Sequence, residues 1–505
     1  METTEVLING AGPTGLMHAL WLTKAGVRVR IIDKAEHAGT TSRALVFHAR
    51  NLEFYHQLGF AEEAVTAGIK ITGVNLWKQG KKAAHASFGN LQTNISPYQY
   101  ILGLGQDMQE QLLGGQLAAA GIKIEWQTEL LSFGQTGNGI SAVLQKADGS
   151  REICNALYLA GCDGAHSIVR KQLGADFPGG TYEETFYVAD LLCTGAYIAE
   201  EMNIALDEAD FLAIFPIKKG NEVRLVGTIR PEALKKTSLK WEDVSEGIIK
   251  RLQIEVQEVK WFSTYKVHHR VAAHFHEGHV FLLGDAGHLH SPIGGQGMNT
   301  GIGDAVNLAW KLAAVIKGHA PATLLDTYEP ERIAFARRLV ATTDMAFTFI
   351  TKRSHLATWV RMNVIPAVIP RFFRFVGARR LLFRTISQTA IQYRHSALSA
   401  GQAGKIKGGD RLPWVPMAGT DNFDSLRSMK WQAHVYGTSS EELQDICNRR
   451  GVLLHIFNWG EAAKKAGLSK DSVYIIRPDG YVGMAGRDNN LSAITRYMEQ
   501  WGIRY

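Results

Sequence analysis

Hydrophobic positions near the start of the chain form two short runs on either side of an apolar-faced helix. Residues 6–9 are an apolar run that enters a glycine turn, and the spacing of apolar residues then predicts a helix over residues 13–25. Gly26 stops this helix, and a second strand is predicted over residues 27–33. The order strand, helix, strand indicates a βαβ unit, in which both strands run parallel in one sheet.

Two more predicted strands end in an abrupt polar break. Residues 156–161 run into Asp163-Gly164, and residues 280–283 run into Gly284-Asp285. Together with the glycine turn after Asn9, the chain therefore has three strand ends of one kind, far apart in the sequence.

The middle of the chain has a different pattern. Between residues 179 and 270, short β-like runs at 185–192, 211–215 and 222–229 alternate with polar turns, which predicts an inserted antiparallel sheet. From Ile302 to Ile316 apolar residues recur at helical spacing, so we expect a helix that packs on the first domain.

The last part of the chain reads as a separate small domain. Residues 399–416 accumulate Gly, Lys and Pro and are typical of a linker. Beyond it, the patterns predict strands at 452–457, 473–477 and 481–485, a hairpin turn at Asp479-Gly480, and a helix at 491–501. A chain of 505 residues is too long for one core. The expected domains are residues 1–178 together with 272–400, an inserted sheet at 179–271, and a small domain at 401–505.

Composition narrows the function classes. Hydrophobic residues make up 46% of the chain and charged residues 20%, and the net charge of +7 comes from scattered Lys and Arg. This distribution favours a solvated basic surface over nucleic-acid binding. The four cysteines show no CxxC spacing and no histidine cluster accompanies them, so neither a disulfide framework nor a metal site is expected.

Nothing in the sequence indicates export or a membrane span. The N-terminus has no basic segment followed by an apolar leader, so a cytoplasmic enzyme is expected. Residues 356–376 are apolar in part, but Arg361, Arg371, Arg374 and two prolines interrupt them, which favours a pair of packed helices.

The first glycine turn has the spacing of a dinucleotide site. In Gly10-Ala11-Gly12-Pro13-Thr14-Gly15, the first glycine makes the turn, the second admits a pyrophosphate, and the third brings helix against sheet. Asp33 ends the second strand, where its carboxylate can accept hydrogen bonds from a ribose. We therefore expect an α/β fold with a Rossmann-like first domain, but this turn alone does not separate NAD from FAD.

The two later breaks decide between these cofactors. The segments Cys162-Asp163-Gly164-Ala165-His166-Ser167-Ile168-Val169-Arg170 and Gly284-Asp285-Ala286-Gly287-His288 resemble the further fingerprints of the class A FAD-dependent aromatic hydroxylases and monooxygenases. The segment from Ser291 to Gly301 is similar to the flavin-ring loop of that family. The tail, with Ile476-Arg477-Pro478-Asp479-Gly480, resembles the thioredoxin-like domain of a longer subgroup that includes phenol hydroxylase and polyketide hydroxylases. Without a CxxC, that domain is expected to have no redox activity.

The resemblance implies FAD as the cofactor and places residues around it. Asp285 matches an aspartate that bonds the ribityl chain, and Asp163 one that lies by the pyrophosphate and is linked to nicotinamide use, although capping of the next helix is the alternative for Asp163. Arg43, and less strongly Arg50, match arginines near the cofactor. Pro292 matches a proline beside the flavin ring, with a purely structural proline as the alternative, and we take Arg43 and Pro292 as the catalytic candidates. The expected cofactor-binding residues are Gly10, Gly12, Pro13, Thr14, Gly15, Asp33, Arg43, Gln106, Asp163, Asp285, Gly295, Gly297, Met298 and Asn299.

By resemblance, NADPH or NADH reduces the flavin, O2 forms a flavin hydroperoxide, and one oxygen atom is transferred to an aromatic or polycyclic substrate. Leu45 stands where phenol hydroxylase has its active-site aspartate, which argues against simple phenols. His48, His268, His269 and Tyr265 are candidate substrate contacts with a structural role as the alternative. Phe211, Phe215 and Phe262 either line an aromatic pocket or fill a core.

Several alternatives stay open from the sequence. The same scaffold supports Baeyer–Villiger or epoxidising chemistry, a reductase of prenyl chains, and a flavoprotein that binds an aromatic ligand without turnover. A flavin-dependent halogenase is disfavoured, because the chain lacks a W-x-W-x-I-P segment. A homodimer stays open as well.

Overall fold

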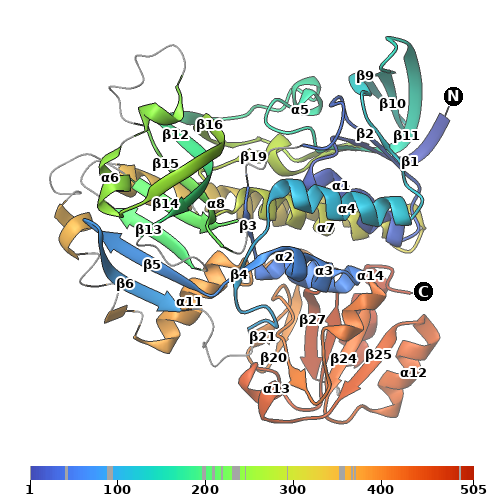
Figure 1. Cartoon of the computed structure of the whole chain (residues 1–505). Coiled ribbons are helices and arrows are strands. Elements are labelled where there is room, and N and C mark those ends of the chain that lie inside the picture. Colours follow the sequence, from blue (N-terminus) through green and yellow to red (C-terminus); the bar gives the residue numbers. More distant parts are fainter. Residues whose placement is uncertain are drawn as a thin grey trace.

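We describe the fold from a computed structural model of the chain. It describes residues 2–39, 44–87, 95–195, 201–206, 211–217, 220–229, 239–244, 246–292, 294–351, 359–364, 368, 371–372, 374–487 and 491–504. Figure 1 shows three bodies: a sheet with long helices, a second large sheet, and a C-terminal sheet.

The first sheet has a parallel centre made of strands from distant parts of the chain. Its order is β17-β18-β11-β1-β2-β8, and β1 pairs in parallel with both β11 and β2, while β11 pairs in parallel with β18. The strands are β1 (Glu2–Asn9), β2 (Val29–Ile32), β8 (Ile124–Glu125), β9 (Glu129–Thr136), β10 (Gly139–Gln145), β11 (Arg151–Gly161), β17 (His276–Glu277) and β18 (Val280–Leu282). The predicted βαβ unit and the two further strands are confirmed, and they are neighbours in one sheet.

Long helices pack together over this sheet. Helix α1 (Pro13–Lys24) contacts both α4 (Gln106–Ala119) and α7 (Gly297–Ile316), and the three run alongside one another in Figure 1. Leu16, Leu20 and Ile302 are fully buried in the shared core. The expected helix at 302–316 is confirmed, and it begins five residues earlier than its apolar spacing indicated, at Gly297.

Further helices and small sheets surround this body. They are α2 (Ala49–Leu58), α3 (Ala61–Ala67), α5 (Ile168–Gln172), α8 (Tyr328–Thr351), a π-helix at Val360–Val364, α11 (Val376–Ile386), and the short strands β3 (Val46–Phe47), β4 (Ile69–Ile71) and β7 (Ile101–Gly103). Of the expected helix pair at 356–376, residues 356–358, 365–367, 369–370 and 373 lie outside the described residues. Among the residues that are described, no helix is both long and apolar enough to cross a membrane.

The second sheet is larger than the sequence indicated. Its order is β19-β16-β12-β15-β14-β13-β5-β6, with β5 (Gly73–Lys78), β6 (Lys81–Ser87), β12 (Gly179–Thr194), β13 (Met202–Leu206), β14 (Phe211–Pro216), β15 (Glu222–Thr228), β16 (Glu255–Val271) and β19 (His288–Leu289). The predicted strands are present, but β5 and β6 come from the first part of the chain. Because β5 joins in parallel with β13, the sheet contains one parallel pair.

The C-terminal sheet lies below α2 in Figure 1, and Gln57 of α2 donates to Pro478 O at 2.9 Å. Its order is β21-β20-β27-β26-β24-β25, and its strands and helices are β20 (Ala400–Ala403), β21 (Ile406–Lys407), β24 (Gln432–Tyr436), α12 (Glu441–Arg450), β25 (Leu453–Phe457), α13 (Glu461–Lys465), β26 (Ser472–Ile476), β27 (Val482–Arg487) and α14 (Leu491–Gln500). The three predicted strands and the last helix are confirmed. The stretch expected as a linker instead contributes β20, which pairs in parallel with β27, and β24 was not expected.

Candidate functional site

The three strand ends found in the sequence meet at one edge of the first sheet. Backbone hydrogen bonds continue past the strands themselves: Gly10 N–H donates to Ile32 O at 2.8 Å, Cys162 N–H to Asn9 O at 2.8 Å, and Leu283 N–H to Gly161 O at 3.0 Å. The carboxyl ends of parallel strands form the usual ligand edge of an open α/β sheet.

Glycines allow the glycine turn to approach its neighbours closely. Gly10 has a φ of +110°, and a Cβ there would lie 2.3 Å from Cys162 O. A Cβ at Gly15 would lie 1.9 Å from Gly10 O, so helix α1 can begin only with glycine at this position. At Gly12, in contrast, a Cβ would meet no protein atom within 4 Å among the described residues. Gly10 and Gly15 therefore shape the turn, and Gly12 faces open space.

Thr14 joins the first turn to the third. A Cβ built at Gly284 would lie 2.8 Å from Thr14 Oγ1, and one at Gly301 would lie 2.3 Å from the same atom. The threonine side chain therefore fits between the turn after β18 and the first turns of α7, where only glycines leave room for it.

Asp33 is bonded to the glycine turn. Its Oδ2 accepts the backbone N–H of Ala11 at 2.7 Å, and its Oδ1 accepts that of Ala35 at 2.8 Å. The side chain is half-buried. Each carboxylate oxygen still has a lone pair for another donor, such as a ribose hydroxyl.

Asp163 caps a helix and keeps one oxygen for another partner. Its Oδ2 accepts the Asn9 side-chain amide at 3.1 Å and the backbone N–H groups of Ile168 and Val169 at 2.8 and 3.2 Å, so it caps the start of α5. Its Oδ1 is buried without a hydrogen-bond partner among the described residues. Burial raises the pKa of this carboxyl above its usual value.

Arg170, the last residue of the second fingerprint, and Asp304, which the sequence analysis did not single out, tie the breaks together. Arg170 donates to Ala165 O at 2.9 Å and to Ala286 O at 2.8 Å, so it links the second and third breaks. Asp304 of α7 accepts the Gly284 N–H at 3.0 Å and His288 Nε2 at 2.7 Å. The only sequence signal for Asp304 was a charged residue inside the apolar helical pattern of residues 302–316.

The Asn299 side chain fixes the loop before α7 by hydrogen bonds. Its amide nitrogen donates to Val46 O at 2.8 Å and to Gly295 O at 2.7 Å, and its Oδ1 accepts His48 N–H and Asn51 Nδ2, both at 2.9 Å. The Asn299 side chain is thus fully engaged with the protein, which leaves backbone groups at the start of α7 to face a ligand.

His48 supports the same loop as a neutral imidazole. Its Nε2 hydrogen-bonds Gly294 O at 3.0 Å, and burial lowers its pKa to about 4. Because a carbonyl only accepts, Nε2 carries the proton, and Nδ1 is a buried acceptor with no partner among the described residues.

Most of the other predicted residues lie in turns or at the starts of helices. Pro292 is exposed beside the buried Ser291, Asp285 is exposed in the turn after β18, and Met298 is half-buried at the start of α7. Gln106 begins α4, where its Nε2 donates to Glu110 Oε1 at 2.9 Å. Arg43 lies outside the described residues.

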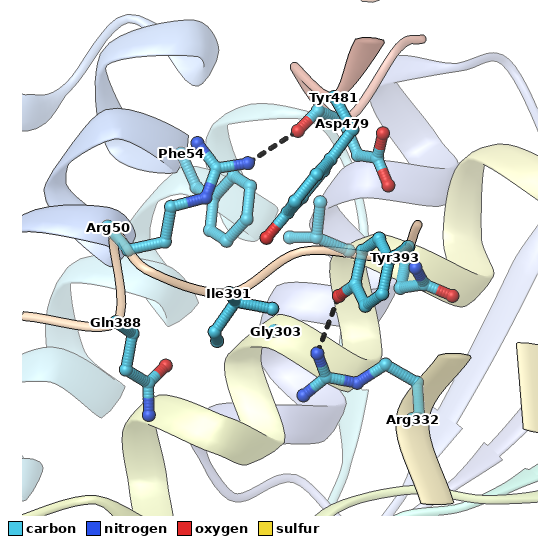
Figure 2. Close-up of a pocket in the computed structure, with 11 residues that line it drawn as sticks. Arg50, Phe54, Gly303, Arg332, Gln388, Ile391, Tyr393, Asp479 and Tyr481 are labelled. Carbon is cyan, nitrogen blue, oxygen red and sulfur yellow. Dashed lines mark hydrogen bonds between the residues drawn. The ribbon is translucent and has the colours of Figure 1, made fainter. Parts of the chain in front are cut away.

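Arg50 lies elsewhere, at the junction with the C-terminal sheet. It donates to Glu53 Oε2 at 2.8 Å and to Asp479 O at 2.6 Å, and it lines a small cavity together with Arg332, Tyr393 and Tyr481 (Figure 2). The Arg50 guanidinium is therefore paired with Glu53 and directed to the turn at Asp479.

The aromatic residues of the second sheet divide between its two faces. Phe215 is paired with Arg224, and Phe262 with Ala189. Because Arg224 is paired with Asp190, the neighbour of Ala189, Phe215 and Phe262 lie on opposite faces. Phe262 stacks on Tyr187 in a core that includes residues of α6 (Glu246–Arg251). Phe215 packs instead against the core of the first body.

The inner face, on the side of Phe215, also carries Phe211 and Tyr265. Both pack around Phe186 and Val267 and are only half-buried. At one end of this sheet β16 pairs with β19, two residues before the loop at Ser291. His268 bonds Thr181, and His269 contacts the Tyr182 ring.

These features fit a dinucleotide. The edge offers open space at Gly12, a buried carboxylate oxygen on Asp163 that needs a donor, and the N-terminus of α1, whose partial positive charge attracts a pyrophosphate.

Comparisons with known proteins agree with this geometry. The sequence profile of the family described as FAD binding domain matches residues 3–343. The chain is 34% identical to a 6-methylpretetramide 4-monooxygenase of Streptomyces rimosus, over 79% of this chain and 71% of that protein. It is 33% identical to a 12-dehydrotetracycline 5-monooxygenase/anhydrotetracycline 6-monooxygenase of Streptomyces rimosus subsp. rimosus, over 97% and 93% of the two chains.

Solved structures give the same result. The anhydrotetracycline hydroxylase OxyS from Streptomyces rimosus superposes over 100% of both chains with a TM-score of 0.80 and 27% identity. The family and the cofactor predicted from the sequence are confirmed. The chain belongs to the FAD-binding-domain family and is an FAD-dependent monooxygenase.

Proposed function

We propose that the three breaks of the first sheet hold FAD, and that the enzyme hydroxylates an aromatic or polycyclic substrate with NADPH or NADH and O2. The observation that carries the first part is the meeting of three strand ends at one edge, with Gly12 open and Asp163 Oδ1 unpartnered among the described residues.

In this proposal each break has a separate task. The pyrophosphate lies at the N-terminus of α1, where it faces the backbone N–H groups of Gly12, Thr14 and Gly15. Asp33 accepts ribose hydroxyls, Asp163 accepts a donor near the pyrophosphate, and Asp285 accepts hydroxyls of the ribityl chain. Gln106 and Arg43 complete the cofactor contacts.

The loop before α7 is assigned to the flavin ring. Gly294 and Gly295 have φ values of +77° and +61°, and Asn299 holds Gly295 in place. The backbone N–H groups of Gly297, Met298 and Asn299 start a 20-residue helix, whose partial positive charge stabilises negative charge on a bound ring. Pro292 lies beside the ring in this arrangement.

FAD, when bound, supplies the transfer of electrons from the nicotinamide and the activation of O2. The protein's own residues have to orient the substrate and keep water away. The inner face of the second sheet carries Phe211, Phe215 and Tyr265 as a half-buried aromatic surface, and the edge strand β19 of this sheet ends two residues before Ser291. The tetracycline-type relatives act on fused rings, which fits such a surface better than a single phenol.

We also propose the division into residues 1–178 with 272–400 for FAD, 179–271 for substrate and 401–505 as a thioredoxin-like domain. The six-stranded C-terminal sheet with helices α12, α13 and α14 supports the last assignment. Strands β5 and β6 add to the substrate sheet from the first segment.

The experiment is to purify the protein with FAD and to measure NADPH oxidation, O2 uptake and products. The test compounds are simple phenols, fused-ring phenols and polycyclic ketones. We expect a fused-ring phenol to stimulate both consumptions and to gain one oxygen atom on a ring carbon. An ester or epoxide product would assign the alternative oxygenase chemistry instead. Product formation without O2 would contradict the proposal.

A further inference from the structure

A buried hydrogen-bond network connects the Gly284 turn to the C-terminal sheet. Its centre is Arg332 of α8, which is 1% exposed. Arg332 donates from Nε to Asp304 Oδ1 at 2.5 Å, from Nη2 to Thr300 O at 3.1 Å, and from Nη1 to Tyr393 Oη at 2.7 Å. Figure 2 shows the last of these bonds at the edge of the small cavity.

One end of this hydrogen-bond network lies at the proposed FAD site. Asp304 accepts the Gly284 N–H, next to Asp285, and His288 Nε2. Thr300 belongs to the first turn of α7, whose N-terminus faces the flavin loop. Gly303 lets Arg332 lie close to the helix, since a Cβ there would be 3.2 Å from Nη2. A displacement of Arg332 therefore moves both the Asp285 turn and the start of α7.

The other end is the C-terminal sheet. The ring of Tyr393 lies 4.5 Å from that of Tyr481, which follows the turn at Asp479-Gly480, and Tyr393 N–H donates to Gly409 O at 2.7 Å. Arg477, in the same turn, donates to Glu331 Oε1 at 2.8 Å, next to Arg332 in sequence. Tyr393 thus contacts both Arg332 and the Tyr481 ring.

We propose that Tyr393 is a positioning residue for the FAD site, through which the C-terminal sheet fixes Arg332 and, with it, the Gly284–Asp285 turn and the first turn of α7. This inference rests on the proposed placement of FAD at these turns. The C-terminal sheet then has a task in cofactor binding although none of its residues lies at the three strand ends.

The physical reason is the cost of an unsatisfied buried donor. Removal of the Tyr393 hydroxyl leaves an N–H of a buried guanidinium without its acceptor, so Arg332 has to shift toward another partner. Such a shift weakens its bonds to Thr300 O and Asp304, and the α7 N-terminus no longer points its N–H groups as before.

The test compares Tyr393→Phe with Tyr474→Phe in the full-length holoenzyme. Tyr474 is also buried and lies inside the C-terminal sheet, but its hydroxyl bonds only neutral groups: it donates to Ala403 O at 3.2 Å and accepts the Ser469 N–H at 2.8 Å. Measurements are the FAD dissociation constant, the midpoint potential of bound FAD and the thermal unfolding of each variant.

We expect Tyr393→Phe to raise the FAD dissociation constant about tenfold, the effect of one lost bond to a buried charge. We also expect a more negative midpoint potential, because reduced flavin loses part of the positive field of α7. Tyr474→Phe should leave the FAD dissociation constant within about twofold of wild type and the midpoint potential unshifted, whatever its effect on stability. Tyr481→Ala, which removes the ring behind Tyr393, should act in the same direction as Tyr393→Phe.

The inference is overturned if the two Tyr→Phe variants change FAD affinity and potential alike, or if neither changes them. Failure of the proposed FAD placement gives a different result, since substitution at Gly12 in the glycine turn would then leave FAD binding intact.

Discussion

The carboxylate of Asp33 accepts the backbone N–H of Ala11 at 2.7 Å, so the end of β2 and the glycine turn form one unit. Removal of this carboxylate frees the turn and also removes the proposed ribose acceptor. We expect Asp33→Ala to raise the FAD dissociation constant at least about tenfold. Asp148→Ala is the matched control, because Asp148 likewise accepts a backbone N–H two residues on, from Ser150, but in a distant hairpin. Equal affinities for the two variants in a fluorescence titration with FAD would contradict the assignment of Asp33.

The junction with the C-terminal sheet depends on buried ion pairs. Arg411 contacts Glu53 at 2.6 Å with both side chains almost fully buried, whereas Arg394 contacts Asp410 at 2.7 Å with 40% of its side chain exposed. We expect Arg411→Met to lower the free energy of unfolding by about 3 kcal/mol, because the buried Glu53 carboxylate loses one of its two arginine partners. Arg394→Met should cost less than about 1 kcal/mol. Urea unfolding measures both, and a larger cost at Arg394 would refute this account of the junction.

The enzyme should lose stability as the pH falls below neutrality. Burial lowers the pKa of His18 to about 4, against a bond to Ala305 O that acts to raise it. Between the unfolded value of about 6.5 and the folded value of about 4, the unfolded chain binds more protons, so stability decreases with falling pH in this window. His18→Gln should reduce the slope by up to about 1.4 kcal/mol per pH unit, as measured by unfolding at several pH values. An unchanged slope would show that His18 does not titrate in this way.

Phe215 and Phe262 should respond in different assays. Phe215 lies on the inner face, next to the proposed substrate, and Phe262 in the core beside α6. We expect Phe215→Ala to raise KM for a fused-ring substrate with a smaller change in kcat. Phe262→Ala should instead lower the unfolding free energy by about 3 kcal/mol with KM unchanged. The reverse pattern would place the substrate on the other face.

The parts that could be predicted from the sequence are those fixed by local pattern. The spacing of Gly10, Gly12 and Gly15 is enough to predict their turn. Apolar periodicity within a short segment predicts β1, α1 and β2. The family resemblance added the two later breaks, because the motif around Asp163 or Asp285 is also local.

The parts that were missed depend on contacts between distant segments. Arg332 and Tyr393 form a hydrogen bond although they are 61 residues apart in the sequence, and neither lies in a motif that predicts this contact. Which face of the second sheet holds Phe262 depends on what covers that face, which alternation by itself does not reveal. The stretch rich in Gly and Lys joined the C-terminal sheet because β27 was available as a parallel partner for β20.

The most direct test of the central claim is FAD binding by Gly12→Val. Gly12 has extended backbone angles and open space around its Cβ position, so the fold should accept the side chain, while the proposed pyrophosphate should not. Gly115→Val, in α4, is the control, since its Cβ position is equally open. We predict that Gly12→Val keeps its circular dichroism spectrum and a melting temperature within about 2 °C of FAD-free wild type, but binds FAD at least about tenfold more weakly. Wild-type FAD affinity in a folded Gly12→Val protein would contradict the claim that this turn holds the cofactor.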